Sequence, residues 1–339
     1  MPEQVIIDSS LLIKMFILAF VAFVVSFSLT PIWTYLLYKW NIRKKIKMAK
    51  DTPVYSALHK KKANVPTMGG VLIWVTVLII TLSFNLSRSQ TYLPLFALIS
   101  IGILGMADDI VNVRGLGPAN GLRARHKIIW LLVIALIGAW WFYFKLGWNI
   151  IHIPGIGDFT IGAWYIPLFV FVILATSNSV NITDGLDGLA GGLLSLCYMA
   201  YAGISFFQGN TGIAIFCATV GGAILAFLWF NIYPARFFMG DTGSLALGAT
   251  LGVIAMLTNS VLILPIIGIV FVIETLSVII QRSYKYVAGG KKIFLSTPIH
   301  HHFEALGWPE TKVTMRFWVI GAVGSIIGLA IALIGRGIR

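Results

Sequence analysis

Five aspartates, Asp108, Asp109, Asp184, Asp187 and Asp241, stand at the ends of long apolar runs in a chain with few charged residues. A carboxylate at the edge of the membrane hydrocarbon is expensive to keep, so it marks a functional site by default. Several carboxylates together repel an anionic substrate unless a divalent cation intervenes, and their oxygen atoms suit Mg²⁺ or Mn²⁺. Phosphoryl transfer needs such an ion and a group that positions the nucleophile. The aspartates therefore predict metal-assisted phosphoryl transfer.

The Asp108-Asp109 pair closes the apolar run that begins at Ile101. Adjacent residues of a helix point about 100° apart, so the two carboxylates face different directions and cannot do the same job. The alternative is a solvated pair that simply ends a helix. Acidic groups at a helix C-terminus oppose the helix macrodipole, which makes this a poor place for carboxylates without a function.

Two polar, glycine-rich segments lead into apolar runs: residues 181–192, which hold Asp184 and Asp187, and residues 231–244, which hold Asp241. Asp184 and Asp187 are three residues apart and would share a face if helical. Plain N-capping of a helix is the alternative. Capping explains one aspartate in each segment, but not the asparagines and repeated glycines. Backbone exposed by glycine at a helix N-terminus is instead a site for a phosphate or a nucleotide.

Three successive histidines, His300, His301 and His302, follow Pro298 near the end of the chain. They cannot all face one point, so we do not expect a three-histidine metal site. Contact of His300 or His301 with an anionic phosphate is the sharper hypothesis, and a surface histidine cluster is the alternative.

Two further charged features have more than one interpretation. Lys60-Lys61-Lys62 either marks membrane topology or attracts an anionic, phosphate-bearing substrate. Glu274 lies within an apolar run, where a buried hydrogen-bonding role fits at least as well as a chemical one.

The elements that position these residues are long apolar stretches. Hydrophobic residues make up 58% of the 339 residues and charged residues 11%, whereas soluble domains carry about a quarter charged residues. Stretches of about 16–25 apolar residues can cross, or nearly cross, a hydrocarbon core of about 30 Å. The sequence predicts an all-α polytopic membrane protein with about ten transmembrane helices, at 11–38, 69–86, 92–107, 128–146, 163–179, 188–207, 211–229, 243–258, 261–281 and 316–335.

The basic residues collect on one side of this arrangement. Of the 25 Lys and Arg, nine lie in 39–62, four in 114–127, one at Arg236 and six in 282–316. The positive-inside rule makes this side cytoplasmic and puts both termini on the periplasmic or extracellular side. All five aspartates and the histidines then lie at the cytoplasmic face, where we expect the active site. A nucleic-acid partner is not expected, because no aromatic–basic interleaving accompanies the net charge of +13.

The remaining features concern organisation. Residues 147–162, the longest outer connection, alternate in polarity and predict a small β-hairpin. Cys197 and Cys217 fall inside apolar spans and are interpreted as packing residues. Finding no soluble domain and no internal repeat, we expect one integral-membrane catalytic domain over residues 1–339. The lack of related halves also weighs against common transporter architectures.

Several of these segments, in the same order along nearly the whole chain, resemble the phospho-N-acetylmuramoyl-pentapeptide-transferase family. The aspartate motifs occur throughout the wider polyprenyl-phosphate sugar-1-phosphate transferase superfamily, whereas the form Pro-Ile-His-His-His-Phe-Glu is specific to the muramoyl branch. The matching segments are 66–70, Asp108-Asp109, 181–190, 238–248, 274–281, 298–304 and 316–318.

The resemblance implies a ten-helix protein, usually a homodimer, in the bacterial cytoplasmic membrane. Undecaprenyl phosphate would attack the β-phosphorus of UDP-MurNAc-pentapeptide, releasing UMP and forming lipid I for peptidoglycan synthesis. Mg²⁺ would be the cofactor. One direct displacement and passage through an enzyme-bound intermediate both remain open.

The resemblance also implies roles for individual residues. Asp241 would bind Mg²⁺, while Asp108, with Asp109 beside it, would deprotonate or position the lipid phosphate. His300 completes the implied catalytic set and, with His301, would contact the diphosphate or the sugar. The implied substrate-binding residues, several of them in a nucleoside pocket, are Lys62, Thr67, Lys127, Asn181, Asp184, Gly185, Leu186, Asp187, Asn231, Phe238 and His301.

Two other functions compete with this one. A relative that transfers GlcNAc-1-phosphate to the same lipid would lack the Pro-Ile-His-His-His-Phe-Glu form. A cation-coupled transporter would place carboxylates near the bilayer midplane and break helices in paired halves. Here the aspartates cluster at one interface, with only Glu274 placed deeper.

Overall fold

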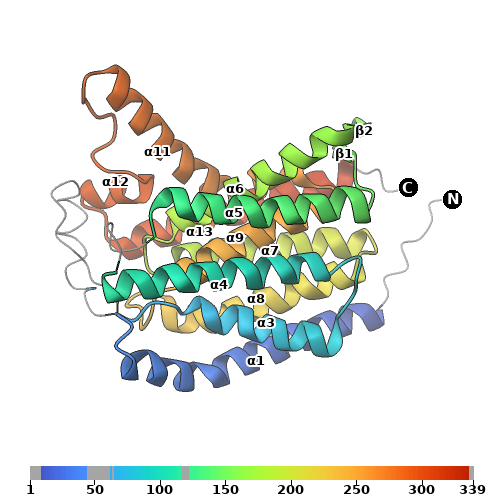
Figure 1. Cartoon of the computed structure of the whole chain (residues 1–339), viewed down its shortest axis with the longest axis horizontal. Coiled ribbons are helices and arrows are strands. Elements are labelled where there is room, and N and C mark those ends of the chain that lie inside the picture. Colours follow the sequence, from blue (N-terminus) through green and yellow to red (C-terminus); the bar gives the residue numbers. More distant parts are fainter. Residues whose placement is uncertain (1–8, 44–61, 63–64, 117–121, 336–339) are drawn as a thin grey trace.

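Helices packed side by side form most of the molecule in a computed structural model, which describes residues 9–43, 62, 65–116 and 122–335 (Figure 1). Within these residues, seven helices are long and apolar enough to cross a membrane, or eight if the bent pair Val261–Ile267 and Ile269–Val287 is one span. The predicted all-α polytopic membrane protein is confirmed to this extent. The count of ten spans and the side of the termini stay predictions.

The described part of the chain consists mainly of α-helices. In chain order they are α1 (Ser9–Lys39), α3 (Gly70–Phe84), α4 (Tyr92–Arg114), α5 (Ala124–Trp140), α6 (Tyr165–Thr183), α7 (Leu189–Phe207), α8 (Thr211–Asn231), α9 (Asp241–Leu257), α10 (Leu264–Ile267), α11 (Ile269–Val287), α12 (Ile299–Ala305) and α13 (Glu310–Gly335).

Several helices extend beyond the apolar runs that predicted them. α4 continues to Arg114, so Asp108 and Asp109 lie inside its last two turns and do not end the helix. The expectation that this pair closes a helix was therefore wrong. α13 begins at Glu310, six residues ahead of the predicted span. Charged residues continue these helices because nothing in the sequence interrupts them, and α4 ends only where Gly115 takes a left-handed conformation (φ +68°).

α9 is buried along nearly its whole length and forms the centre of the bundle. Its small residues allow this close packing, as in other membrane helix interfaces. Gly70 of α3 lies directly against Gly243, and a β-carbon on Gly105 of α4 would overlap the main chain of Asp241. Gly248 likewise lies against the main chain of α6. The first turn of α9 is thus held against its neighbours by main-chain contact.

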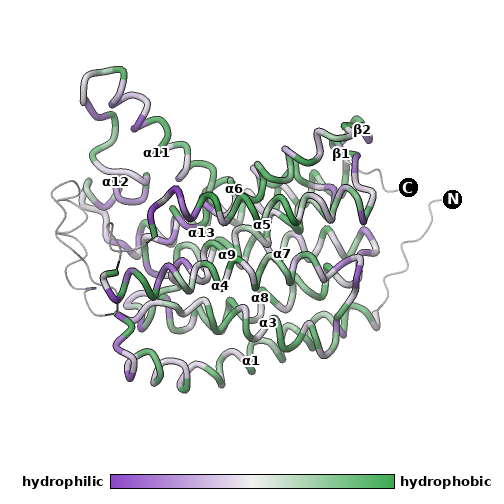
Figure 2. The backbone as a smooth tube through the Cα atoms, in the orientation of Figure 1, coloured by the Kyte–Doolittle hydropathy of each residue, from purple (hydrophilic) through white to green (hydrophobic). Residues whose placement is uncertain are grey.

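The outside of the bundle is apolar. Phe20, Phe171 and Trp229 are each about two-thirds exposed, at 67%, 68% and 67%. Figure 2 shows hydrophobic residues along the helices and hydrophilic residues gathered toward their ends. Soluble monomers rarely expose apolar surface on this scale, so the exterior suits a lipid environment.

The two ends of the bundle differ. The predicted β-hairpin is confirmed: β1 (Ile150–Ile153) pairs antiparallel with β2 (Gly157–Thr160). It lies at the right of Figure 1, where α1 begins and α13 ends, and α12 lies at the opposite end. The cysteines are also as predicted, since Cys197 and Cys217 are both buried and free.

α11 leaves the bundle at a sharp bend. Its axis turns by 82° from the preceding Val261–Ile267 segment, with the break at Gly268. It projects at the upper left of Figure 1 with α12 beside it. The segment 288–298 that follows α11 leads back to the histidine-bearing α12 at the end of the bundle (Figure 1).

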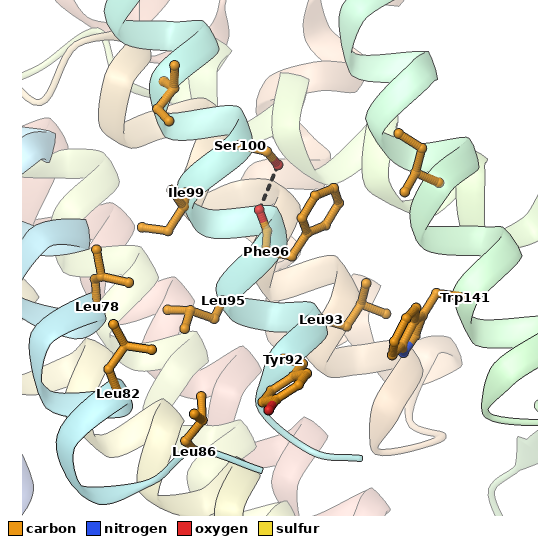
Figure 3. Close-up of a pocket in the computed structure, with 12 residues that line it drawn as sticks. Leu78, Leu82, Leu86, Tyr92, Leu93, Leu95, Phe96, Ile99, Ser100 and Trp141 are labelled. Atoms are coloured by element: carbon orange, nitrogen blue, oxygen red, sulfur yellow. Dashed lines mark hydrogen bonds between the residues drawn. The ribbon is translucent and has the colours of Figure 1, made fainter. Parts of the chain in front are cut away.

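An apolar groove of about 750 Å³ lies on the side of the bundle between α3, α4 and α5 (Figure 3). Leucine, isoleucine and aromatic side chains form most of its walls. The hydroxyl of Ser100 donates back to the carbonyl of Phe96 at 2.6 Å within its own helix. The groove therefore presents hydrocarbon rather than groups suited to phosphoryl chemistry.

Candidate active site

A polar cavity of about 200 Å³ lies at the end of the bundle where α4, α6 and α9 meet. Three of the five predicted aspartates line it, and Asp108 lies next to Asp109 on α4. Only Asp187 contributes to a separate cluster. The lining residues are Thr67, Asp109, Asn112, Val113, Asn181, Asp184, Gly240 and Asp241.

Lys127 joins two of the aspartates. Its Nζ lies 2.6 Å from Asp108 Oδ2 and 2.5 Å from Asp241 Oδ2, so one ammonium group bridges carboxylates of α4 and α9. Asp108 also accepts a hydrogen bond from the main-chain N–H of Leu122 at 2.7 Å. Two partly buried carboxylates repel one another unless a cation lies between them. The predicted substrate-binding lysine therefore holds the cluster together in this structure.

Asp241 is oriented from a second direction by α6. Asn181 donates from Nδ2 to Asp241 Oδ1 and to the hydroxyl of Ser244, both at 2.9 Å. The other oxygen of Asp241 faces Lys127. Because the carboxylate stands at the first residue of α9, it also lies at the positive end of the helix dipole. The side chain is thus fixed at the mouth of the cavity.

Asp109 holds the start of α9. Its carboxylate accepts hydrogen bonds from the main-chain N–H of Asp241 at 3.3 Å, the N–H of Thr242 at 3.1 Å and the hydroxyl of Thr242 at 2.7 Å. These N–H groups have no partner inside their own helix. Asp109 of α4 therefore caps α9, whereas its neighbour Asp108 faces Lys127. The two aspartates have different partners, as their helical spacing predicted.

Gly240 permits this arrangement. It has a φ of +75°, which side-chain-bearing residues rarely adopt, and a β-carbon there would overlap Asp109 Oδ2. The neighbouring main chain is also fixed, because Phe238 N donates to Pro66 O at 2.8 Å and Gly70 N donates to Met239 O at 2.9 Å. The motif at 66–70 and the motif at 238–244 thus form one structural unit, which places Thr67 in the cavity wall.

The second glycine-rich segment forms a turn between α6 and α7. Asp184 and Asp187 are not helical, so they do not share a helix face. No side chain caps α7, whose N-cap is Gly188. Asn231 instead binds the turn, accepting from Gly188 N at 3.1 Å and donating to Phe237 O at 2.9 Å. With both ends of its amide used on main chain, Asn231 fixes the position of the two loops.

Asp187 lies in a second cluster with Lys62. Lys62 Nζ is 2.6 Å from Asp187 Oδ1 and 5.9 Å from the centre of the Phe238 ring. The other carboxylate oxygen of Asp187 accepts from Ala235 N at 3.0 Å. Leu186, the preceding residue, is buried at 3% exposure. The structure therefore brings Asp187 and Phe238, two residues expected around a nucleoside, together with the predicted substrate-binding Lys62.

The histidines have three different partners, which agrees with the expectation that they cannot face one point. His301 Nδ1 lies 2.7 Å from Glu304, and His302 Nδ1 accepts from Leu295 N at 3.2 Å. His300 is fully buried, with Nδ1 3.0 Å from the equally buried Glu274. A surface histidine cluster is thus excluded for His300 and His301.

His300 lies directly beneath the turn that follows α6. A β-carbon on Gly185 would overlap its Nε2, so this position accepts only glycine without rearrangement. The proximity of Glu274 to His300, and of His300 to the loop of Asp184, agrees with a structural role for Glu274, which stays a prediction. Contact of His300 with a diphosphate stays a prediction.

Replacing Glu274 tests this structural role. We expect Glu274→Gln to lower the yield of folded protein and its stability by about 2 kcal/mol, because the substitution changes a fully buried polar contact with His300. The turnover of molecules that fold should change little. The checks are the monodisperse fraction, the melting temperature in detergent and turnover per folded molecule. A fully stable variant with turnover reduced a hundredfold would contradict the structural assignment.

Three residues near the site were not expected. Thr242 binds Asp109, Asn112 lines the cavity, and Glu310 contacts both Lys62 and the main chain of Asp187. Glu310 follows Pro309 at the start of α13, and proline followed by an acidic residue is a helix-start signal that the sequence does contain. No local sequence pattern predicts the role of Thr242, because its contact with Asp109 depends on α4 packing beside α9.

The donor set is suitable for the expected metal. Carboxylate, amide and hydroxyl oxygens line the cavity, and these are hard ligands of the kind that Mg²⁺ takes. In the described part of the chain, no three His, Cys, Asp or Glu side chains converge as a complete metal site. Mg²⁺ commonly uses one or two carboxylates together with water and substrate phosphates. The cavity wall can supply such a carboxylate at Asp241.

Comparisons with known proteins agree with the resemblance seen in the motifs. The profile of glycosyl transferase family 4 matches residues 91–259, which include all five aspartates. A phospho-N-acetylmuramoyl-pentapeptide-transferase of Chloroflexus aurantiacus is 42% identical, covering 94% of this chain and 89% of the relative. Proteins of the same name from Geobacillus thermodenitrificans and Geobacillus sp. are 40% and 45% identical, covering 98% and 80% of this chain and 99% and 85% of the relatives. The chain therefore belongs to the phospho-N-acetylmuramoyl-pentapeptide-transferase family.

Proposed function

We propose that this protein transfers phospho-MurNAc-pentapeptide from UDP-MurNAc-pentapeptide to undecaprenyl phosphate, producing lipid I and UMP. The observation that carries the proposal is the bridge Asp108–Lys127–Asp241 beside a polar cavity at one end of an apolar helix bundle. Family membership supports the same reaction. A site at a helix end, and not in the middle of the bundle, suits a soluble nucleotide on one side and a membrane lipid on the other.

The proposed reaction exchanges one phosphorus–oxygen bond for another. A phosphate oxygen of the lipid attacks the β-phosphorus of the nucleotide sugar, and the bond from that phosphorus to the oxygen of UMP breaks. Asp108 removes a proton from the lipid phosphate or positions it, and Lys127 beside it attracts the anion. Asp109 is not suited to the same task, because it caps α9 with three accepted hydrogen bonds.

Asp241 is the proposed Mg²⁺ ligand. Its oxygens stand at the cavity wall, and Asn181 holds the carboxylate in orientation. The ion, when bound, supplies neutralising charge at the diphosphate. Lys127 balances the negative charge of Asp241 in this structure and lies where its ammonium group can attract the substrate phosphates.

The nucleoside is proposed to lie beside the second cluster. Lys62, Leu186, Asp187 and Phe238 come together there and present charge, hydrogen-bonding groups and an aromatic ring. Gly185 lies against the ring of His300, which packs where a β-carbon would stand and so supports the turn at the edge of this region. His301 is assigned to the sugar or diphosphate side.

The cellular setting follows from the same proposal. The protein would lie in the bacterial cytoplasmic membrane as a homodimer, with the active site facing the cytoplasm. It would act in peptidoglycan synthesis and so in cell-wall growth, cell shape and cell division. The single catalytic domain over residues 1–339 stays a prediction.

The decisive experiment measures UMP release by the purified protein in detergent with Mg²⁺ and undecaprenyl phosphate. UDP-MurNAc-pentapeptide and UDP-GlcNAc are offered separately, with EDTA as the metal control. We expect release with the muramoyl nucleotide alone and its loss in EDTA. Release with UDP-GlcNAc alone would assign the chain to the GlcNAc-1-phosphate branch. No release with either nucleotide, from well-folded protein, would overturn the proposal and reopen the transporter hypothesis.

A further inference from the structure

One face of α13 binds the main chain of the turn between α6 and α7. Glu310 accepts a hydrogen bond from Asp187 N at 2.6 Å, Thr314 donates to Asp187 O at 3.4 Å and Trp318 donates to Gly188 O at 3.2 Å. These three residues are four apart, so they lie one above another on a single helix face. They bind consecutive peptide groups of the same turn, which makes the contact a specific docking of α13.

Glu310 differs from the other two because it carries charge. Its Oε1, the same atom that accepts from Asp187 N, also contacts Lys62 Nζ. Lys62 in turn pairs with Asp187 Oδ1 at 2.6 Å. One carboxylate oxygen thus fixes both the main chain of Asp187 and the ammonium group that faces its side chain.

The cluster is largely removed from solvent. The side chain of Asp187 is 3% exposed, that of Glu310 11% and that of Lys62 14%. In a buried cluster, a hydrogen bond to a charged group contributes more to stability than a hydrogen bond between neutral groups. A buried N–H that loses its acceptor destabilises the folded state. Without Glu310, the Asp187 N–H would lose its acceptor, and Lys62 would lose one of the two anionic partners that it has among the described residues.

We propose that Glu310 is a positioning residue that sets nucleotide affinity by holding Asp187 and Lys62 in place. The inference rests on the proposed function, in which these two residues border the nucleoside. Glu310 does not reach the Asp108–Lys127–Asp241 bridge in any contact that the structure describes. Its loss should therefore change binding of the nucleotide more than the rate of phosphoryl transfer.

The test compares Glu310→Ala, Glu310→Gln and the wild type in full-length protein. Glutamine keeps an oxygen that can accept from Asp187 N but loses the charge that holds Lys62. Thr311→Ala, an exposed neighbour on the same turn of α13, is the matched control. The readouts are kcat, the KM for UDP-MurNAc-pentapeptide and the affinity for UMP by calorimetry.

We expect KM to rise about tenfold and UMP affinity to fall by about the same factor in Glu310→Ala, with kcat within about threefold of wild type. Glu310→Gln should lie between, near threefold, about 0.65 kcal/mol. Thr311→Ala should match wild type. Unchanged KM and UMP affinity in both Glu310 variants would overturn the inference, as would a large loss of kcat at unchanged KM.

A double variant separates positioning from general structural damage. If Glu310 acts through Lys62, then Lys62→Ala with Glu310→Ala should weaken UMP binding no more than about twofold beyond the larger single effect, because coupled residues are not additive. Full additivity would contradict the coupling. Should Glu310→Ala fail to fold, Glu310→Gln alone decides the result.

Failure of the proposed function would appear differently. A wild-type protein that binds UMP but releases none from either nucleotide sugar overturns the reaction, while the calorimetric comparison still tests Glu310. A wild-type protein that neither turns over nor binds UMP overturns both proposals.

Discussion

Asp241→Asn is expected to abolish UMP release, with turnover lower by about a thousandfold or more, since the proposed metal ligand and a negative charge of the site are both lost. Asparagine has nearly the same shape, so the packing of α9 against α4 is unaffected. It removes the charge that faces Lys127 at 2.5 Å and that we assign to Mg²⁺. The measurement is single-turnover UMP release with saturating lipid and a series of Mg²⁺ concentrations.

The matched control is Asp158→Asn in the hairpin at the opposite end of the bundle. Asp158 pairs with His152 at 2.7 Å and its side chain is 63% exposed, so the same chemical change should leave turnover at the wild-type level. Near-normal release by Asp241→Asn would remove the metal assignment.

Lys127→Met is expected to lower both activity and stability. Methionine fills similar space but leaves Asp108 and Asp241 facing one another without the ammonium group that lies within 2.6 Å of each. We expect a loss of about 2 kcal/mol of stability, at the low end for breaking a buried pair because Lys127 is partly exposed. Turnover should fall about a hundredfold, since the anionic substrate loses its nearest cation.

A second substitution distinguishes the two effects. Lys127→Met combined with Asp108→Asn removes the repulsion, so stability should return toward wild type while turnover stays low. Lys145→Met, on an exposed lysine where the helix of Lys127 ends, is the control for the substitution itself. An unchanged melting temperature in Lys127→Met would show that the bridge does not stabilise the fold.

Local patterns in the sequence were enough to predict much of the helical framework. Apolar runs gave the positions of the main helices, and alternation gave the hairpin at Ile150–Thr160. The ends of helices were less predictable, because polar and charged residues such as Asp108, Asp109 and Arg114 continue a helix as readily as they end it. The 82° bend at Gly268 was not predicted either, since one glycine in an apolar run is compatible with a straight helix.

The site was predictable as a set of residues but not as a set of contacts. Carboxylates that stand near glycines and asparagines at the ends of apolar runs predicted Asp109, Asp184 and Asp241 as site residues. All three line one cavity. The partners came from distant segments: Lys127 is 114 residues from Asp241, and Lys62 is 125 from Asp187. Pairing of this kind depends on how helices pack, which no local spacing encodes.

The pairing of Glu274 with His300 illustrates the same limit. Each residue was noted separately, one as an ambiguous carboxylate in an apolar run and the other as a potential phosphate contact. Their distance of 3.0 Å arises because the segment 288–298 after α11 folds back and places α12 against the first part of α11. Because both side chains are fully buried and adjacent, we interpret Glu274 and His300 as a pair that supports the fold.

The glycine contacts at the start of α9 have a consequence for how the protein responds to salinity. Gly70 meets Gly243, and Gly105 meets the main chain of Asp241, without a charge between them. Dissolved ions screen charged groups over about 8 Å at physiological ionic strength, but they do not loosen contact between main chains. A high salt concentration should therefore weaken the electrostatic attraction of the site for anions. The distance between α4 and α9, which carry Asp108 and Asp241, should stay the same.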